Sequence, residues 1–338
     1  MTMKGDQLSL VDVGVRLTAA MRRHCGADAH IDNLVPTTLG GSNRTILFDL
    51  KTGVSSRRLV LRQESVPPDY TPFLPSAVQW EVVSAAFRHG VLVPEPIMQL
   101  KSEDGLGDGF IMAAVDGESL PKRLLNEPRF ATARERFLDQ AGVILASLHG
   151  IDTQAFAVLE QWPESGDPIE AQLGYYDRYG LSYPAMEYVA RWLMRNRPSQ
   201  STRVPVHGDF RNGNMLVDET GIRAVLDWEC AHLGDHHEDF GWFCTRSWRF
   251  GHNERPAGGF GSRETLYQAY EQAGGRTIDR DAARWWEIFG LLRWANFNIM
   301  QVYGHISGRR RSPRFAACGR NICLMELDML RTIAGQID

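Results

Sequence analysis

The spacing of apolar residues divides the chain into a strand-rich first part and a helix-rich second part. Residues 8–24 carry apolar side chains at every third or fourth position, which predicts an amphipathic helix. Four β-type runs follow in two pairs, with a helix at 76–89 between the pairs; the runs are 45–50, 58–63, 96–100 and 109–115. The turn sequence KTGVSS joins the first two runs, so we expect a hairpin. The order predicts a small antiparallel sheet with one inserted helix.

Helical periodicity dominates from about residue 129 onwards. An apolar stripe predicts a helix that ends near residues 149–150, and two short strand-like runs at 215–217 and 224–226 interrupt the helical sequence. Further helices are expected at 188–196, 262–272, 281–303 and 314–333. The pattern predicts an α+β protein with a first lobe over residues 1–115 and a larger, mainly helical lobe over residues 116–338.

Composition narrows the class of protein. The chain has 338 residues, with 37 basic and 41 acidic side chains and a net charge of −4, and 43% of it is hydrophobic. These values are typical of a globular protein. The near-neutral balance argues against nucleic acid as a partner. A length near twice the commonest domain size fits one two-lobed domain or two fused domains.

Cysteine usage and targeting signals bear on the compartment. The five cysteines include no CxxC pair, which argues against a disulfide framework or a structural zinc site and favours a reducing cytosol. Asp6 and Gln7 interrupt the N-terminal segment where a signal peptide needs an apolar core, and no apolar run approaches the length of a membrane span. We therefore expect a cytoplasmic protein without a membrane partner.

Candidate chemistry is concentrated between residues 204 and 229, in the sequence VPVHGDFRNGNMLVDETGIRAVLDWE. Four polar side chains lie around the two short predicted strands: His207, Asp209, Asn214 and Asp227. They can therefore converge on one pocket. Phosphoryl transfer needs a carboxylate that orients an attacking hydroxyl and accepts its proton, together with the hard oxygen ligands that Mg²⁺ prefers. The alternative is a polar turn that carries these residue types by chance.

The same segment resembles a known family. HGDFRNGN resembles the HxDxxxxN catalytic loop of the aminoglycoside phosphotransferase and choline kinase group. LDWE looks like that group's counterpart of the protein-kinase DFG segment, and GDHHEDF is similar to its GDPxxDLA segment. The resemblance implies a two-lobed protein-kinase-like fold and transfer of the γ-phosphoryl group of ATP to a hydroxyl of a small molecule. It also implies that Asp209 is the base and that Asn214 and Asp227 hold Mg²⁺.

The resemblance further implies where ATP binds. Gly41, Ser42 and Asn43 precede a predicted strand, at the position of a loop that covers phosphates; by itself such a turn is a plain loop. The run FIMAAV, which contains Ala114, resembles the strand and hinge behind the adenine, and a buried strand is the alternative.

One departure from the family concerns its ATP-binding lysine. The lysine is expected on the strand RLVLRQ, where this chain has Arg62, and the nearest lysine is Lys51. A guanidinium suits both a carboxylate and a phosphate, so Arg62 is expected to pair with Glu81 and to contact a phosphate. Glu81 occupies the place of the family's helix glutamate, and a solvated helix residue is the alternative.

A cluster of histidines and carboxylates follows the LDWE segment. It consists of His232, His236, His237, Glu238 and Asp239. No HExxH or Cys/His spacing supports a zinc site there. The resemblance implies instead that Asp235 and Asp239 support the catalytic loop.

Two other functions are alternatives to a small-molecule kinase. Arg62 allows a pseudokinase that binds a nucleotide or ligand without catalysis, although a binding protein has no need of a base such as Asp209. A protein kinase is disfavoured because no APE-like segment follows LDWE.

Charge in the expected acceptor-binding segments bears on the substrate. Residues 151–206 hold seven acidic and five basic side chains and residues 234–338 hold twelve and fourteen, so the totals are equal. A pocket for polycationic aminoglycosides needs an excess of carboxylates. Five of the nine tryptophans also lie in 234–338. These segments favour a neutral, apolar or anionic acceptor. The runs LVLRQ and WRFG are most similar to family members of unassigned substrate, including those fused to acyl-CoA dehydrogenases.

Overall fold

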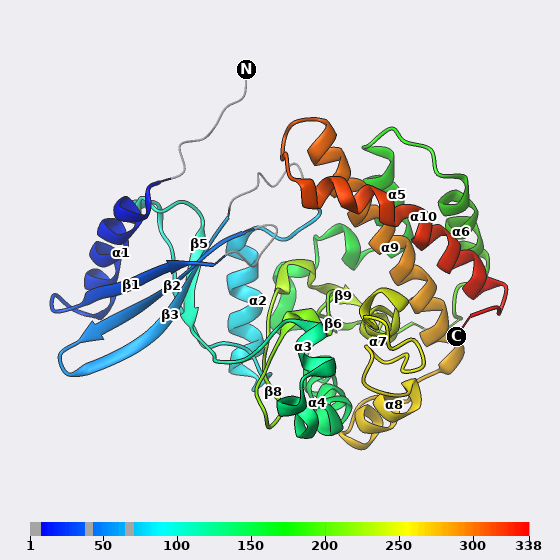
Figure 1. The fold of residues 1–338 in the computed structure, drawn as a ribbon, viewed down its shortest axis with the longest axis horizontal. Helices are drawn as coiled ribbons and strands as arrows, with labels where there is room; N and C mark the ends of the chain where they lie inside the picture. The colour runs from blue at the N-terminus through cyan, green and yellow to red at the C-terminus, as the bar shows by residue number, and fades with distance from the viewer. Residues whose placement is uncertain (1–7, 38–42, 65–70, 200, 338) are drawn as a thin grey trace. The chain divides into compact units, whose positions relative to one another are not determined.

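The computed structural model describes residues 8–37, 43–64, 71–199 and 201–337 (Figure 1). Its internal contacts divide the chain into two compact units. The first unit consists of Met1–Arg88 with Val93–Val115, and the second of His89–Leu92 with Asp116–Asp338. The first unit contains an antiparallel sheet and the second is mainly helical, which confirms the predicted α+β class.

A five-stranded antiparallel sheet forms the body of the first unit, in the order β1-β2-β3-β5-β4. Its strands are β1 (His30–Pro36), β2 (Asn43–Thr52), β3 (Ser55–Glu64), β4 (Pro96–Gln99) and β5 (Gly109–Ala113). β2 and β3 form the predicted hairpin, whose two-residue turn places Gly53 at a φ of 55°. β1 is not predicted, because this edge strand contains a bulge and buries only Ile31 fully. It therefore lacks the alternation that marks a strand in sequence.

Two helices accompany this sheet, α1 (Leu10–Cys25) and α2 (Ser76–Arg88), both at predicted positions. The side chain of Ser9 accepts a hydrogen bond from the backbone N–H of Asp12 and so caps α1. The buried face of α1 joins Phe48 and Leu61 of the sheet in one apolar core. α2 packs against β4 and β5.

The second unit is built from α-helices around the long helix α9. Those in its described part are α3 (Pro121–Asn126), α4 (Ala131–His149), α5 (Pro168–Asp177), α6 (Pro184–Arg195), α7 (His237–Cys244), α8 (Arg263–Gln272), α9 (Arg280–Ile306) and α10 (Pro313–Ile333). α9 packs against α5, α6, α7 and α10, and its Trp285 and Trp286 fill the apolar core between them. Within the described ranges, no single helix has the length and apolar composition of a membrane span, although the bent pair Pro128–His149 and Thr153–Leu159 meets that test by length and composition.

Two short antiparallel ladders position the segment that carries the candidate chemistry. β6 (Val204–Val206) pairs with β9 (His232–Gly234), and β7 (Met215–Val217) pairs with β8 (Ile222–Val225). The sequence predicts β7 and β8 but not β6 and β9, which are too short to show a period. HGDFRNGN connects β6 to β7, and the LDWE segment follows β8.

Helix α7 is buried along its whole length. Gly241 permits close packing of α7 on α9, because a Cβ at this position would collide with the backbone of Trp286. The first turn of α7 holds His237, Glu238 and Asp239, which are polar and nevertheless buried. Buried polar groups need hydrogen-bond partners. The partners of Asp239 include the backbone of the candidate site.

Candidate active site

The segment HGDFRNGN begins with a left-handed turn at Gly208. Gly208 has a φ of 73°, and a Cβ there would collide with the carbonyl group of Cys230. Both features require glycine. His207 before the turn is fully buried, whereas the side chain of Asp209 after it keeps 15% of its surface exposed. The turn therefore leads from a buried histidine to an accessible carboxylate.

Three donors hold the Asp209 carboxylate. Trp242 donates its indole N–H to Oδ1 at 2.8 Å, and Arg211 donates from Nε to the same oxygen at 3.0 Å. Asn214 donates from Nδ2 to Oδ2 at 2.6 Å. Because both oxygens have donors, the plane of the carboxylate is fixed. An ionised carboxylate offers about four acceptor positions, so a position remains for a further donor.

Asn214 and Asp227 lie on adjoining segments. The backbone N–H of Leu226 donates to the carbonyl oxygen of Asn214 at 2.8 Å, and Asp227 is the next residue. The Asn214 amide nitrogen donates to Asp209, which leaves its Oδ1 as the atom that could bind a cation. Asp227 has the left-handed φ of 60°, a conformation that residues other than glycine rarely adopt. A carboxamide oxygen and a carboxylate are hard donors, so this pair fits Mg²⁺.

His207 is a neutral structural link. Its Nδ1 accepts a hydrogen bond from the backbone N–H of Asp209 at 3.1 Å, and its Nε2 lies 2.9 Å from the carbonyl oxygen of Leu226, to which it donates. One nitrogen accepts and the other donates, so the imidazole carries one proton. Burial agrees with this state, because it lowers the pKa of His207.

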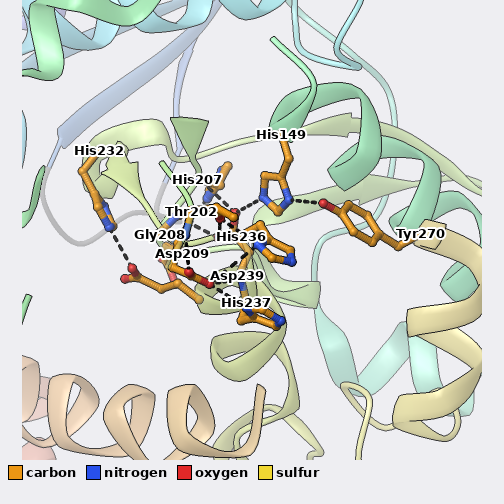
Figure 2. Close-up of polar contacts among 12 residues, drawn as sticks. His149, Thr202, His207, Gly208, Asp209, His232, His236, His237, Asp239 and Tyr270 are labelled. Carbon is orange, nitrogen blue, oxygen red and sulfur yellow. Dashed lines mark hydrogen bonds and ion pairs between the residues drawn. The ribbon is translucent and has the colours of Figure 1, made fainter. Parts of the chain in front are cut away.

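Asp239 forms hydrogen bonds with the backbone of the turn at Gly208, as expected from the family resemblance. Its buried carboxylate accepts the backbone N–H groups of His207 at 3.0 Å and Gly208 at 2.9 Å (Figure 2). His149 Nε2 lies 3.2 Å from the same carboxylate, and its Nδ1 lies 3.2 Å from the hydroxyl of Tyr270. Burial alone would raise the pKa of Asp239, but the hydrogen bond and charge of His149 and the contacts with His207 lower it.

The expectation that Asp235 also supports the catalytic loop is wrong. Asp235 accepts the backbone N–H of Thr202 at 2.8 Å and contacts Nδ1 of His237 at 2.6 Å. Burial raises its pKa, but the hydrogen bonds from His237 and Thr202 outweigh burial and bring it to about 2. Asp235 lies before the first turn of α7 and contacts Thr202, which precedes β6, whereas Asp239 contacts His207, which follows β6.

Asp235, His236 and His237 form a compact buried group whose potential ligand atoms lie within 4.8 Å of one another. Their hydrogen bonds occupy those atoms. His237 contacts Asp235 through Nδ1, and its Nε2 accepts the backbone N–H of Asp279 at 3.0 Å. His236 Nδ1 lies 2.8 Å from the hydroxyl of Thr202. These hydrogen bonds hold the start of α7 in place, and they favour a structural role for the group over a metal site.

The residues that the sequence assigns to ATP lie in the first unit. Gly41 and Ser42 are outside the described residues, and Asn43 begins β2. Arg62 lies on β3, opposite Phe110 of β5, and is buried. Arg62 is therefore a buried residue of the central strand of the sheet.

Glu81 and Ala114 occupy different elements of that unit. Glu81 is exposed on α2, whereas Arg62 is buried on β3. Ala114 directly follows β5 and donates its N–H to the carbonyl oxygen of Arg58 at 3.0 Å.

Sequence reasoning missed the aromatic and arginine side chains that border the catalytic-loop carboxylate. The ring centroid of Trp242 lies 5.3 Å from that of Trp248, and Trp248 lies 4.9 Å from Trp294. The guanidinium of Arg211 is 4.8 Å from the Trp248 ring, and that of Arg293 is 5.3 Å from the Trp242 ring. Arg211 stands within the motif and could have been singled out. Trp242 and Arg293 carry no local signal.

This fold and site define a kinase-like phosphotransferase. A family model described as "Phosphotransferase enzyme family" matches residues 33–286, and the chain belongs to this family. A crystal structure of a Ralstonia eutropha protein designated an aminoglycoside phosphotransferase has a TM-score of 0.72 and 26% identity, covering 96% of this chain and 98% of that chain. An ethanolamine kinase from Plasmodium vivax shares the fold with a TM-score of 0.63 at 12% identity, covering 99% of this chain and 94% of that chain.

Curated relatives include much longer proteins. Mouse acyl-CoA dehydrogenase family member 10 is 30% identical over 220 residues, which are 61% of this chain and 19% of that protein. Human acyl-CoA dehydrogenase family member 11 is 31% identical over 218 residues, or 60% of this chain and 26% of that protein. The chain thus spans about a fifth to a quarter of the length of these relatives.

The buried His236 predicts a pH dependence of stability. Burial and the neighbouring His237 lower the pKa of His236 to about 4, so the folded protein binds fewer protons there than the unfolded chain between about pH 4 and 6.5. Stability should therefore fall as the pH is lowered through this window, by at most about 1.4 kcal/mol per pH unit from this group. Urea unfolding at pH 7, 6 and 5 should show a shallower dependence for His236→Asn than for the wild type.

The matched control is His252→Asn, which changes a more exposed histidine of the same unit. It should keep the wild-type slope. Equal slopes for His236→Asn and the wild type would contradict the assignment of a buried neutral imidazole.

Proposed function

We propose that this chain transfers the γ-phosphoryl group of ATP to a hydroxyl group of a small molecule. The observation that carries the proposal is the Asp209 carboxylate, which is held by donors from Trp242, Arg211 and Asn214, keeps a further acceptor position and is 15% exposed. A hydroxyl that donates to this position is oriented for attack, and the carboxylate then accepts its proton. Positioning of this kind supplies much of the rate gain in phosphoryl transfer.

Asn214 Oδ1 and the Asp227 carboxylate are the groups that we propose as ligands of Mg²⁺. Mg²⁺, when bound, neutralises charge that develops on the phosphates. The chain itself orients Asn214 through its hydrogen bond to Asp209, and Asp227 has a left-handed backbone. Their hard oxygen donors support this assignment.

The first unit, proposed here as the lobe over residues 1–115, is the nucleotide-binding part of this hypothesis. Solved neighbours of the fold include a phosphotransferase in a ternary complex with streptomycin and ATP, at a TM-score of 0.54. By resemblance to the family, Gly41, Ser42 and Asn43 cover the phosphates and Ala114 borders the adenine. We assign the phosphate contact to Arg62 and, by resemblance to the family, a role in the same lobe to Glu81. Residues 116–338 supply the base and the acceptor site.

Changing Asp209 tests the base. Asp209→Asn should leave nucleotide binding nearly intact and lower turnover by a factor of about 10²–10⁴, because an amide does not accept the proton of the hydroxyl. Mg-dependent ATP turnover with a panel of hydroxylated compounds measures this. Asp218→Asn makes the same chemical change in the β7–β8 turn and should have little effect. Near-wild-type turnover by Asp209→Asn would remove Asp209 from the mechanism and favour the alternative of a nucleotide-binding pseudokinase.

Arginine and lysine variants test the phosphate contact. Arg62→Ala should weaken ATP binding or slow transfer, and Arg62→Lys should keep part of the function because a point charge also meets a phosphate. Lys51→Ala should do little, since Lys51 pairs at 2.6 Å with Asp32 on the neighbouring strand. ATP titrations of the three variants decide between the two positions. A strong effect of Lys51→Ala without one from Arg62→Ala would contradict the assignment to Arg62 and move the phosphate contact to Lys51.

The acceptor should be neutral, apolar or anionic. The ring of Trp248 near Asp209 already faces the guanidinium of Arg211, which is partly exposed, so a cationic acceptor meets like charge there. A coupled assay should compare kanamycin-type compounds, choline and ethanolamine with hydroxyacyl compounds and aromatic alcohols. We expect little turnover of the cationic set. An aminoglycoside used with kcat/KM at or above about 10⁴ M⁻¹s⁻¹ would overturn this assignment, since that is the lower edge of ordinary enzymatic efficiency.

A further inference from the structure

Three buried ionisable side chains form a chain of contacts that ends at the turn before Asp209. His232 of β9, Glu238 of α7 and Arg293 of α9 are each at most 3% exposed. His232 Nε2 lies 3.0 Å from one oxygen of Glu238, and the other oxygen lies 3.5 Å from Nη1 of Arg293. The same Nη1 donates to the carbonyl oxygen of Gly208. In Figure 2 a dashed line marks the contact of the His232 ring.

The hydrogen bonds of His232 favour its charged imidazolium form. Its Nδ1 lies 2.9 Å from the carbonyl oxygen of Cys230 and its Nε2 lies 3.0 Å from the Glu238 carboxylate, so each nitrogen faces an acceptor, which favours a proton on both. Burial alone would lower the pKa of His232, and Arg293 opposes the charge as well, but attraction to Glu238 raises the pKa overall. Glu238 therefore serves two cations, His232 and Arg293.

A contribution to folding stability does not by itself explain why these three ionisable side chains are buried together. Replacing a buried ion pair by well-packed apolar side chains is often neutral or stabilising, so buried charge needs another reason. The contact between Arg293 and the turn at Gly208 supplies such a reason. Arg293 holds the carbonyl of Gly208, while Asp239 holds its N–H, so the left-handed residue is fixed through both of its peptide groups. The residue that follows is Asp209.

Arg293 also reaches Asp209 by a second route. Its guanidinium lies 5.3 Å from the ring centroid of Trp242 and 5.3 Å from that of Phe297. Trp242 is the donor to Oδ1 of Asp209. One guanidinium thus contacts both the backbone before the carboxylate and the indole that orients it.

We propose that Arg293 is a positioning residue for Asp209, with His232 and Glu238 holding its guanidinium against the Gly208 carbonyl. This inference rests on the proposed role of Asp209. Displacement of a reacting group by about 1 Å can cost about 10² in rate, so loss of the guanidinium should lower kcat by about that factor. KM and the Kd of ATP should change by less than about threefold, because Arg293 is assigned no contact with substrate.

The kinetic test compares Arg293→Met, Arg293→Lys and Glu238→Gln, using the best acceptor of the panel or, without one, Mg-dependent ATP hydrolysis. Arg293→Met should lose kcat, and Arg293→Lys should recover part of it. Arg284→Met removes another ion-paired arginine from the same helix and is the matched control, expected to keep wild-type kcat. Circular dichroism establishes that each variant is folded. A folded Arg293→Met with wild-type kcat overturns the proposal.

A double-mutant cycle separates this inference from the proposed function. If Arg293 acts through Asp209, adding Arg293→Met to Asp209→Asn should lower the residual turnover no further, because coupled residues are not additive. Independent, multiplying losses contradict the proposal. If Asp209→Asn itself keeps full turnover, the proposed function fails and the cycle shows it. If Asp209→Asn is inactive and folded Arg293→Met is not, only the positioning role fails.

A spectroscopic measurement tests the same contact without activity. The indole ¹⁵N–¹H resonance of Trp242, assigned with Trp242→Phe, reports the bond to Asp209. Asp209→Asn should shift this resonance, and Arg293→Met should shift it in the same direction because the indole loses its position. Arg284→Met should leave it in place. An unchanged resonance in folded Arg293→Met contradicts the positioning role.

Discussion

The turn at Gly208 depends on buried charge on both of its sides. Asp239 accepts its N–H and Arg293 donates to its carbonyl oxygen, and each of these groups is removed from water. A buried charge is costly unless it is paired, so each needs a partner: His149 for Asp239 and Glu238 for Arg293. The end of α4, the first turn of α7 and the middle of α9 must therefore meet at one place. These three helices therefore have to be packed so that their charged side chains reach the turn at Gly208.

The sequence predicts those elements whose apolar side chains recur with a clear period over many residues. The β2–β3 hairpin and the long helix α9 are examples, and their observed bounds differ from the predicted ones by a few residues. β6 and β9 have three residues each, and β1 is an edge strand with a bulge. Such strands are specified by their pairing partners rather than by their own pattern, so sequence spacing does not reveal them.

The candidate site divides in the same way. Asp209 and Asn214 belong to one local motif, and their hydrogen bond joins residues five apart. The bond from Trp242 to Asp209 spans 33 residues and that from Arg293 to the turn spans 85, so no local pattern contains them. Asp235 and Asp239 look equivalent in the sequence, and only the start of helix α7 decides which of them faces the turn. Arg293 also lies beyond residues 33–286, which the family model matches.

The single open acceptor position on Asp209 has a consequence for how such proteins diversify. On the proposed mechanism, this carboxylate recognises that a molecule carries a hydroxyl and nothing else about it. The identity of the molecule must be read by other side chains, on helices that can change without disturbing the buried turn. On this mechanism, the residues that determine acceptor selectivity can change while the residues around Asp209 stay the same. Solved structures that share this fold are named for macrolides, spectinomycin and ethanolamine.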